Sequence, residues 1–104
     1  MAYHFTMTHH AQVERIDRIT ACLEHLGFNE FILEVKEENR LYRLTDTGII
    51  FVFGETGETL ITGYMGAPLK ISALYKRAGY AETPSTVWKM AKRNQKLYAF
   101  LTEI

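Results

Sequence analysis

The chain has 104 residues, a formal net charge of zero from twelve basic and twelve acidic side chains, and 47% hydrophobic residues. This composition is typical of one globular domain, so we expect residues 1–104 to fold as a single unit and exclude a mainly disordered chain. The single cysteine, Cys22, excludes an internal disulfide and a thiolate zinc site. No apolar run is long enough to span a bilayer and no signal-peptide pattern is present, so we expect a cytoplasmic protein without a membrane partner.

The neutral total conceals two parts of opposite charge. Residues 1–65 carry five basic and ten acidic side chains, a net of −5, and residues 66–104 carry seven basic and two acidic ones, a net of +5. Such a division predicts two surfaces that meet different partners, or two parts that attract each other. The attraction would act within one chain or between the two chains of a homodimer.

The N-terminal part predicts an extended segment followed by a helix. Tyr3 to Thr8 alternates large and polar side chains, as a short strand or extended arm does, and Thr8 then suits an N-cap. Apolar residues recur at helical spacing from about His9 to Leu26, and Gly27 follows where a left-handed C-cap glycine is expected. The apolar stripe consists of Val13, Ile16, Ile19, Cys22, Leu23 and Leu26.

Four strand-like runs follow, rich in β-branched and aromatic residues and separated by turn sequences that suit antiparallel neighbours. They are residues 31–35, 41–45, 49–53 and 59–65. The run from Ile49 to Phe53 is apolar throughout, which predicts a central strand covered on both faces. Around the second run, alternation places Arg40 and Tyr42 on one face of the sheet and Arg43 on the other.

The last third of the chain returns to helical spacing. A short helix is expected after Pro68, ending at Gly79, and Thr83-Pro84 predicts an N-cap followed by proline at the first position of a longer helix. The expected apolar stripe of that helix is Val87, Met90, Ala91, Leu97, Tyr98, Leu101 and Ile104. We therefore expect an α+β fold in which an N-terminal helix packs on an antiparallel sheet of three to four strands, followed by two C-terminal helices.

The C-terminal helices carry the first candidate site, a basic surface with little interleaved acid. Four cations fall on one helical stripe, and a continuous basic surface attracts phosphate chains by releasing their counterions. A nearby indole ring can stack on unpaired bases. The alternative is the ordinary charged face of an amphipathic helix. The expected nucleic-acid-binding residues are Lys70, Arg77, Trp88, Lys89, Lys92, Arg93 and Lys96.

A second candidate lies at the start of the first helix. His9 and His10 can supply a general acid or base near neutral pH, and Arg15 or Arg18 can hold a phosphate. The alternative is a solvated helix face on which Glu14 and Arg18 pair. The histidine spacing does not suit a metal ion, so we expect no metal and no cofactor. An arginine, a tyrosine and a histidine that converge on a sheet surface can cleave RNA through its 2′-hydroxyl group.

The order of these motifs resembles small bacteriophage and prophage proteins related to the RelE-like ribonucleases. The resemblance rests on His10-Ala11 to Arg15 and Arg18, on residues 42–52 and on residues 60–64, and it covers most of residues 5–98. It implies a helix packed on an antiparallel sheet whose exposed face binds RNA and cleaves it without metal. The residues that it places near this face are His10, Arg15, Arg43, Thr62 and Tyr64, and His10, Arg15, Arg43 and Tyr64 form the expected catalytic group.

Two functions are therefore expected as alternatives. The first is a phage-type protein that binds RNA or another polyanion, with metal-independent ribonuclease activity as its extension. The second is a non-catalytic protein-interaction module, such as a phage inhibitor of a host enzyme or defence complex. In the second, the acidic region of residues 14–58 mimics nucleic acid toward a basic partner.

Overall fold

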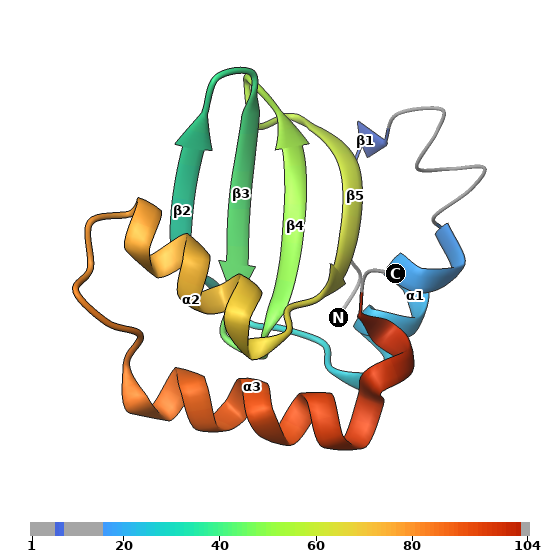
Figure 1. Cartoon of the computed structure of the whole chain (residues 1–104). Helices are drawn as coiled ribbons and strands as arrows, with labels where there is room; N and C mark the ends of the chain where they lie inside the picture. The colour runs from blue at the N-terminus through green and yellow to red at the C-terminus, as the bar shows by residue number, and fades with distance from the viewer. Residues whose placement is uncertain (1–5, 8–15, 103–104) are drawn as a thin grey trace.

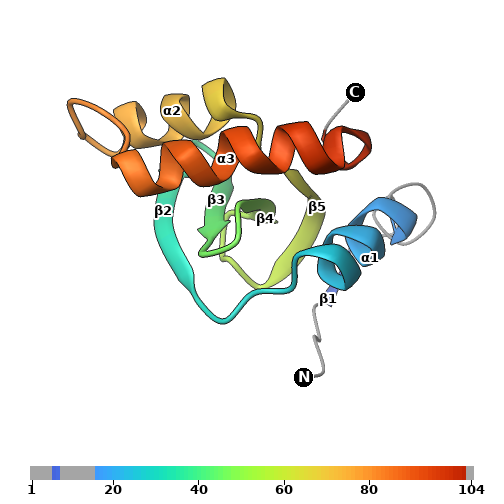
Figure 2. The same ribbon diagram turned by 90° about the horizontal axis from the view of Figure 1, so that it is seen from below.

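The computed structural model describes residues 6–7 and 16–102, and it confirms the predicted α+β fold. One curved sheet has α2 and α3 on one side, while α1 packs on the other side beside β5 (Figure 1, Figure 2). The helices are α1 (Ile16–His25), α2 (Pro68–Arg77) and α3 (Ser85–Tyr98), and a 3-10 turn, Ala99–Leu101, follows. The strands are β1 (Thr6–Met7), β2 (Phe31–Glu37), β3 (Arg40–Thr45), β4 (Ile49–Gly54) and β5 (Thr59–Met65).

The sheet has the strand order β1-β5-β4-β3-β2. Strands β2 to β5 form the antiparallel meander that the turn sequences predict. The two-residue β1 adds a fifth strand, which pairs in parallel with β5, and Thr102 bridges Met65 further along the same edge. Two segments from opposite parts of the sequence therefore cover the outer edge of β5, where backbone groups would otherwise lack partners.

Strand β4 is central and buried on both faces, as its apolar sequence predicts. Phe51 packs on the α1 side with Ile19, and its exposed fraction is 0%. Ile50 and Val52 pack on the other side with Ile71 of α2. The sheet thus separates two apolar clusters, and each cluster has its own helix cover.

The ends of α1 and α2 match the sequence where the structure describes them. Gly27 follows α1 with a φ of 55°, and its N–H donates to the Leu23 carbonyl at 2.9 Å. Pro68 opens α2, and Gly79 follows that helix with a φ of 97°. The expected N-cap at Thr8 and the expected start of the first helix at His9 lie outside the described residues.

The predicted start of α3 is wrong. Pro84 takes the N-cap position with extended backbone angles, the helix begins at Ser85, and no side chain caps it. The Oγ1 atom of Thr83, the expected cap, is buried without a hydrogen-bond partner in the described part of the chain. The extended ψ of 138° at Pro84 keeps that residue out of the helix, so the helix starts after the proline rather than with it.

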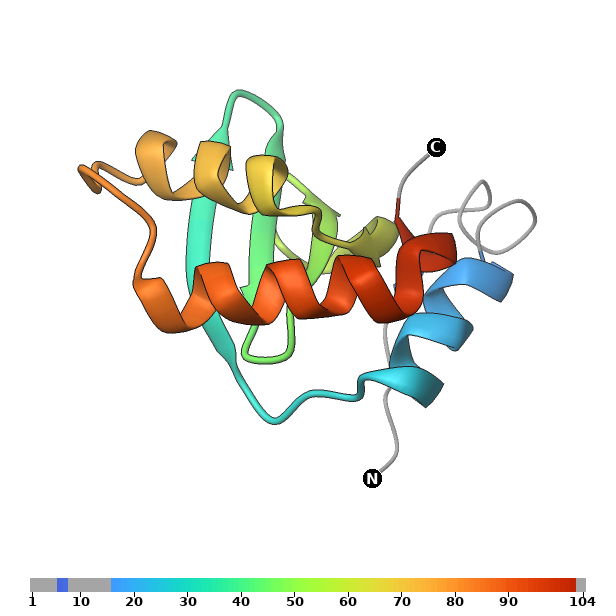
Figure 3. The ribbon, with the colours of Figure 1, turned by 60° about the horizontal axis from the view of Figure 1, so that its bottom comes forward.

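The buried side of α3 also differs from the apolar stripe read from the sequence. Ala91 and Leu101 are buried as expected, but Leu97 is 58% exposed, and Asn94 is buried with 2% of its surface accessible. Figure 3 shows α3 running beside α2 and across the ends of the strands toward α1. At that crossing, Asn94 Nδ2 donates to the Thr47 carbonyl at 2.8 Å. The buried Asn94 thus supplies the hydrogen-bond donor that the Thr47 carbonyl in the β3–β4 turn requires.

Candidate functional site

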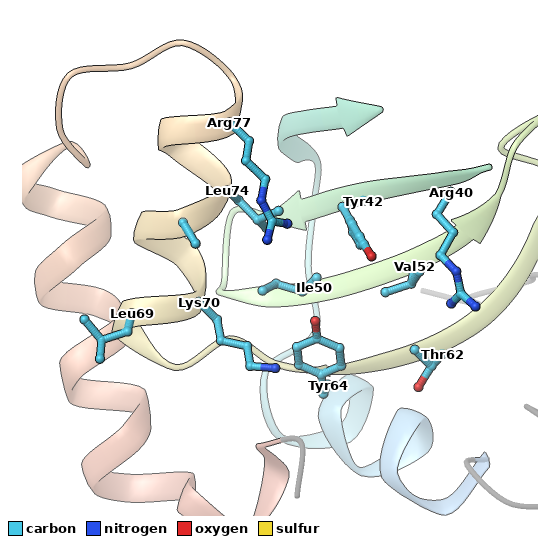
Figure 4. A pocket seen from close by; sticks show the side chains of 11 residues that line it. Arg40, Tyr42, Ile50, Val52, Thr62, Tyr64, Leu69, Lys70, Leu74 and Arg77 are labelled. Atoms are coloured by element: carbon cyan, nitrogen blue, oxygen red, sulfur yellow. The ribbon is translucent and has the colours of Figure 1, made fainter. Parts of the chain in front are cut away.

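A hollow of about 510 Å³ lies between α2 and the sheet face formed by β3, β4 and β5. Figure 4 shows the sheet as the floor of this hollow and α2 as its wall. Alternation supplies the floor, because every second residue of a strand points to the same face. The floor residues are Arg40, Tyr42, Ile50, Val52, Thr62 and Tyr64, and the wall residues are Leu69, Lys70, Ala73, Leu74 and Arg77.

A bulge in β5 places Thr62 and Tyr64 on this floor. Thr62 pairs with Val52, but the next pair joins Leu60 to Phe53, so the strand register shifts at this point. Leu60 therefore packs in the cluster on the α1 side, although it is two residues from Thr62. A regular strand would place Leu60 and Thr62 on one face, and the bulge separates them.

The hollow is positively charged. Arg40, Lys70 and Arg77 line it, and no acidic residue of the described part of the chain does. Arg77 Nη1 lies 3.0 Å from Glu37 Oε1 in an ion pair whose two side chains are 50% and 40% exposed. Because exposed pairs hold their partners weakly, Arg77 keeps part of its attraction for a ligand. This pair also joins the acidic and basic parts of the chain within one molecule.

Two cations lie near the ring of Tyr64, which lines the hollow. The ring centroid is 5.8 Å from Arg18 Cζ and 5.4 Å from Lys70 Nζ, and Tyr64 is 8% exposed. Cations near an aromatic ring are attracted by its negative faces. The ring is therefore within reach of one positive charge from α1 and one from α2.

Arg18 turns inward from α1 to β5. Its Nε donates to the Gly63 carbonyl and its Nη2 donates to Thr62 Oγ1, both at 3.0 Å. Position 63 has no side chain, and a Cβ there would lie 3.4 Å from Ile19 Cγ1 of α1 and 2.9 Å from Phe51 Cδ1 of β4, so glycine suits this close packing. The expectation that Arg18 lies on the solvated face of the helix is therefore wrong, and its expected partner Glu14 lies outside the described residues.

We expect Arg18→Met to lower the free energy of unfolding by about 2 kcal/mol, because it removes two hydrogen bonds from a charged, half-buried donor. Urea unfolding measures this loss. The matched variant Arg93→Met changes an exposed arginine of α3 and should lower stability by less than about 0.5 kcal/mol. Equal midpoints for the two variants would show that the contacts of Arg18 with β5 contribute nothing.

Arg43 lies on the other face of the sheet from Tyr64. Its Nε donates to Glu34 Oε2 at 2.9 Å, and its Cζ lies 4.9 Å from the Phe53 ring centroid. The structure therefore does not bring Arg43 together with Tyr64. Arg40, which alternation in β3 places with Tyr42, lines the hollow instead.

The other candidate residues are divided among several places. His10 and Arg15 lie outside the described residues. Lys70 and Arg77 line the main hollow, whereas Trp88 and Lys92 line a second hollow beside α3. The remaining cations of α3 are exposed and line neither hollow: Lys89, Arg93 and Lys96. Two lining residues, Arg40 and Tyr42, were absent from the expected site, although their shared face was visible in the sequence.

The described acidic residues of the predicted acidic region include two that are paired with arginine and several that are exposed in turns. Glu34 pairs with Arg43, and Glu37 pairs with Arg77. The exposed residues Glu38, Glu55 and Glu58 belong to the β2–β3 and β4–β5 turns, which lie at one end of the sheet (Figure 1). The protein-interaction module that the acidic residues suggested stays a prediction.

Cys22 does not have the environment of a reactive thiol. Burial raises its pKa to about 11, and the charge of Arg18 and a backbone hydrogen bond from Met65 offset only part of this effect. The thiol is therefore protonated near neutral pH, whereas a nucleophilic or metal-binding cysteine reacts as the ionised thiolate. Because the ordinary pKa is 9.0, the contribution of the buried thiol to stability is complete below pH 9 and is lost as the pH rises through about 11.

Two features are absent from residues 6–7 and 16–102, the part of the chain that the structure describes. No three His, Cys, Asp or Glu side chains in these ranges are grouped so that they could hold a metal ion. No helix in these ranges has the length and apolar composition needed to cross a membrane.

Comparisons of the chain with protein-family models, with curated proteins and with solved structures found no match. The resemblance to RelE-like ribonucleases stays a prediction. The chemistry of the hollow between α2 and the sheet is therefore the basis for a functional proposal.

Proposed function

We propose that the protein binds single-stranded RNA in the hollow between α2 and the sheet. The observation that supports this proposal most is the lining: among the described residues, three cations and two tyrosines line one hollow, and no acidic residue does. Cations attract phosphates, and tyrosine rings offer surfaces for unpaired bases. A purely structural charged face would not gather these groups in a concave site.

The positions of the cations favour a phosphate chain over a single small anion. Arg40 extends from β3 over the sheet, whereas Lys70 and Arg77 extend from α2 on the other side of the hollow (Figure 4). Between them, Tyr42 is half-buried and can pack against a base. A ligand that carries several phosphates with bases between them matches this arrangement.

Fluorescence anisotropy with labelled single-stranded RNA tests the proposal. We expect binding at low salt, with a slope of about −2 for the logarithm of the binding constant against the logarithm of salt concentration. This slope follows from three lining cations and roughly −0.7 for each neutralised phosphate of a single strand. Duplex RNA of the same length should bind more weakly, because its bases cannot stack on tyrosine. Absence of binding at low salt, or equal affinity for the duplex, contradicts the proposal.

RNA cleavage is a second candidate, and it rests on the position of Tyr64 near both Arg18 and Lys70. In this reading, the ribose 2′-hydroxyl attacks the phosphorus and loses its proton to water, the bond from phosphorus to the 5′-oxygen breaks, and the phenol gives a proton to that leaving oxygen. The two cations stabilise the negative charge that develops on the other phosphate oxygens. We expect Tyr64→Phe to lower cleavage of labelled RNA in the presence of a chelator by at least about 100-fold. The matched variant Tyr80→Phe, at an exposed tyrosine outside the hollow, should leave the rate unchanged. Equal rates in the two variants would exclude proton transfer by Tyr64.

A further inference from the structure

A second hollow adjoins the first at Leu69. This second hollow has a volume of about 310 Å³ and lies between the start of α2 and the middle of α3. Leu69 lines both hollows and is 78% exposed. In Figure 4, Leu69 leaves α2 on the side away from Tyr64, whereas Lys70 extends toward Tyr64. One exposed leucine at the first turn of α2 therefore forms the boundary between the two hollows.

The second hollow offers one cation and one large aromatic ring. Among the residues that the structure describes, Lys92 is the only charged one that lines it, and Trp88 supplies a half-buried indole ring. Neither α2 nor α3 contains an acidic residue. Lys70 and Lys92 therefore place one positive charge in each hollow, and the exposed side chain of Leu69 lies between the two hollows.

We infer that one strand of RNA continues from the main hollow over Leu69 into the second hollow, where a base stacks on Trp88 and a phosphate meets Lys92. This inference rests on the proposed function and narrows its ligand to an oligonucleotide several residues long. Stacking on an aromatic ring and a phosphate contact with lysine are the two interactions by which proteins follow single strands. The continuity at Leu69 and the matching charge both favour this occupant of the second hollow.

Trp88 is the single tryptophan of the chain, so tryptophan fluorescence reports on the second hollow. Stacking of a base on the indole should quench its fluorescence. We expect an RNA oligomer of about ten nucleotides to quench the fluorescence at saturation. A dinucleotide should compete with the oligomer for the main hollow but should not quench the fluorescence of Trp88.

Two lysines of α3 provide a matched pair of variants. Lys92 lines the second hollow, whereas Lys89 is exposed on the same helix and lines neither hollow. We expect Lys92→Glu to weaken binding of the oligomer about tenfold, and Lys89→Glu to weaken it by less than about threefold through long-range charge alone. Neither variant should change competition by the dinucleotide, which occupies only the main hollow.

The results that would reject the second hollow as part of the site differ from those that would reject the proposed function. Binding of the oligomer without quenching, or equal losses from Lys92→Glu and Lys89→Glu, would overturn the second hollow as part of the site and leave the main hollow as the binding site. If neither the oligomer nor the dinucleotide binds at low salt, the proposed function fails, and the inference fails with it.

Discussion

The double variant Arg40→Glu/Lys70→Glu should bind single-stranded RNA at least about 100-fold more weakly than the native protein, about tenfold for each reversed cation. These side chains lie on opposite sides of the hollow, so their reversal places negative charge on both sides of the ligand. Both residues are exposed, and circular dichroism should show an unchanged fold. Anisotropy titrations at low salt measure the loss in affinity.

The control for this variant is Lys36→Glu/Arg93→Glu. It makes the same change in net charge at two exposed residues, one on β2 and one on α3, that line neither hollow. Long-range repulsion is screened by salt, so we expect this variant to weaken binding by less than about fivefold. Similar losses in both variants would mean that RNA responds to the overall charge and not to the hollow.

The largest expected loss of stability comes from Phe51→Ala, at about 3–5 kcal/mol. Phe51 is fully buried in the central strand, and its ring lies 5.7 Å from that of Phe28 and 6.3 Å from that of Phe53. Its ring also packs against Gly63 of β5, where a Cβ would lie 2.9 Å from Phe51 Cδ1. Removal of the ring leaves a cavity where the helix, the sheet and the aromatic cluster meet. Chemical unfolding measures the loss.

Two further variants keep this prediction testable if Phe51→Ala does not fold. Phe51→Leu retains most of the side-chain volume and should cost roughly 1–2 kcal/mol. Phe100→Ala removes a phenylalanine that is 65% exposed and should cost less than about 1 kcal/mol. If Phe51→Leu were as stable as the native protein, the packing around Phe51 would not be a main source of stability.

Local sequence signals predicted most of the fold correctly. The apolar sequence of Ile49 to Phe53 identified the central strand, and Gly27, Pro68 and Gly79 marked helix ends. Each of these signals acts over a few residues. The pairing of β1 with β5 and the bridge at Thr102 join segments that are distant in the sequence. Because no turn connects such segments directly, no local turn sequence indicates that they pair. The polar contact of Asn94 likewise depends on where α3 crosses the sheet, which spacing within the helix does not reveal.

The candidate site was predicted less completely for related reasons. Alternation in β3 placed Arg40 and Tyr42 together, but it did not indicate that α2 would cover that face rather than the face of Arg43. The direction of Arg18 follows its hydrogen bond to the Gly63 carbonyl, a contact between residues far apart in the sequence. Periodicity identifies two faces of an element, whereas tertiary packing determines which face becomes the site.

Nuclear magnetic resonance of the ¹⁵N-labelled protein, titrated with single-stranded RNA, tests the binding site most directly. We expect the largest shifts of backbone amides at Tyr42, Thr62 and Lys70, on β3, β5 and the first turn of α2, because these residues line the main hollow. Amides of the β2–β3 and β4–β5 turns, where Glu38 and Glu55 are exposed, should shift least. Binding with the largest shifts outside the two hollows, or no shifts at low salt, would contradict the assignment of the hollow as an RNA-binding site.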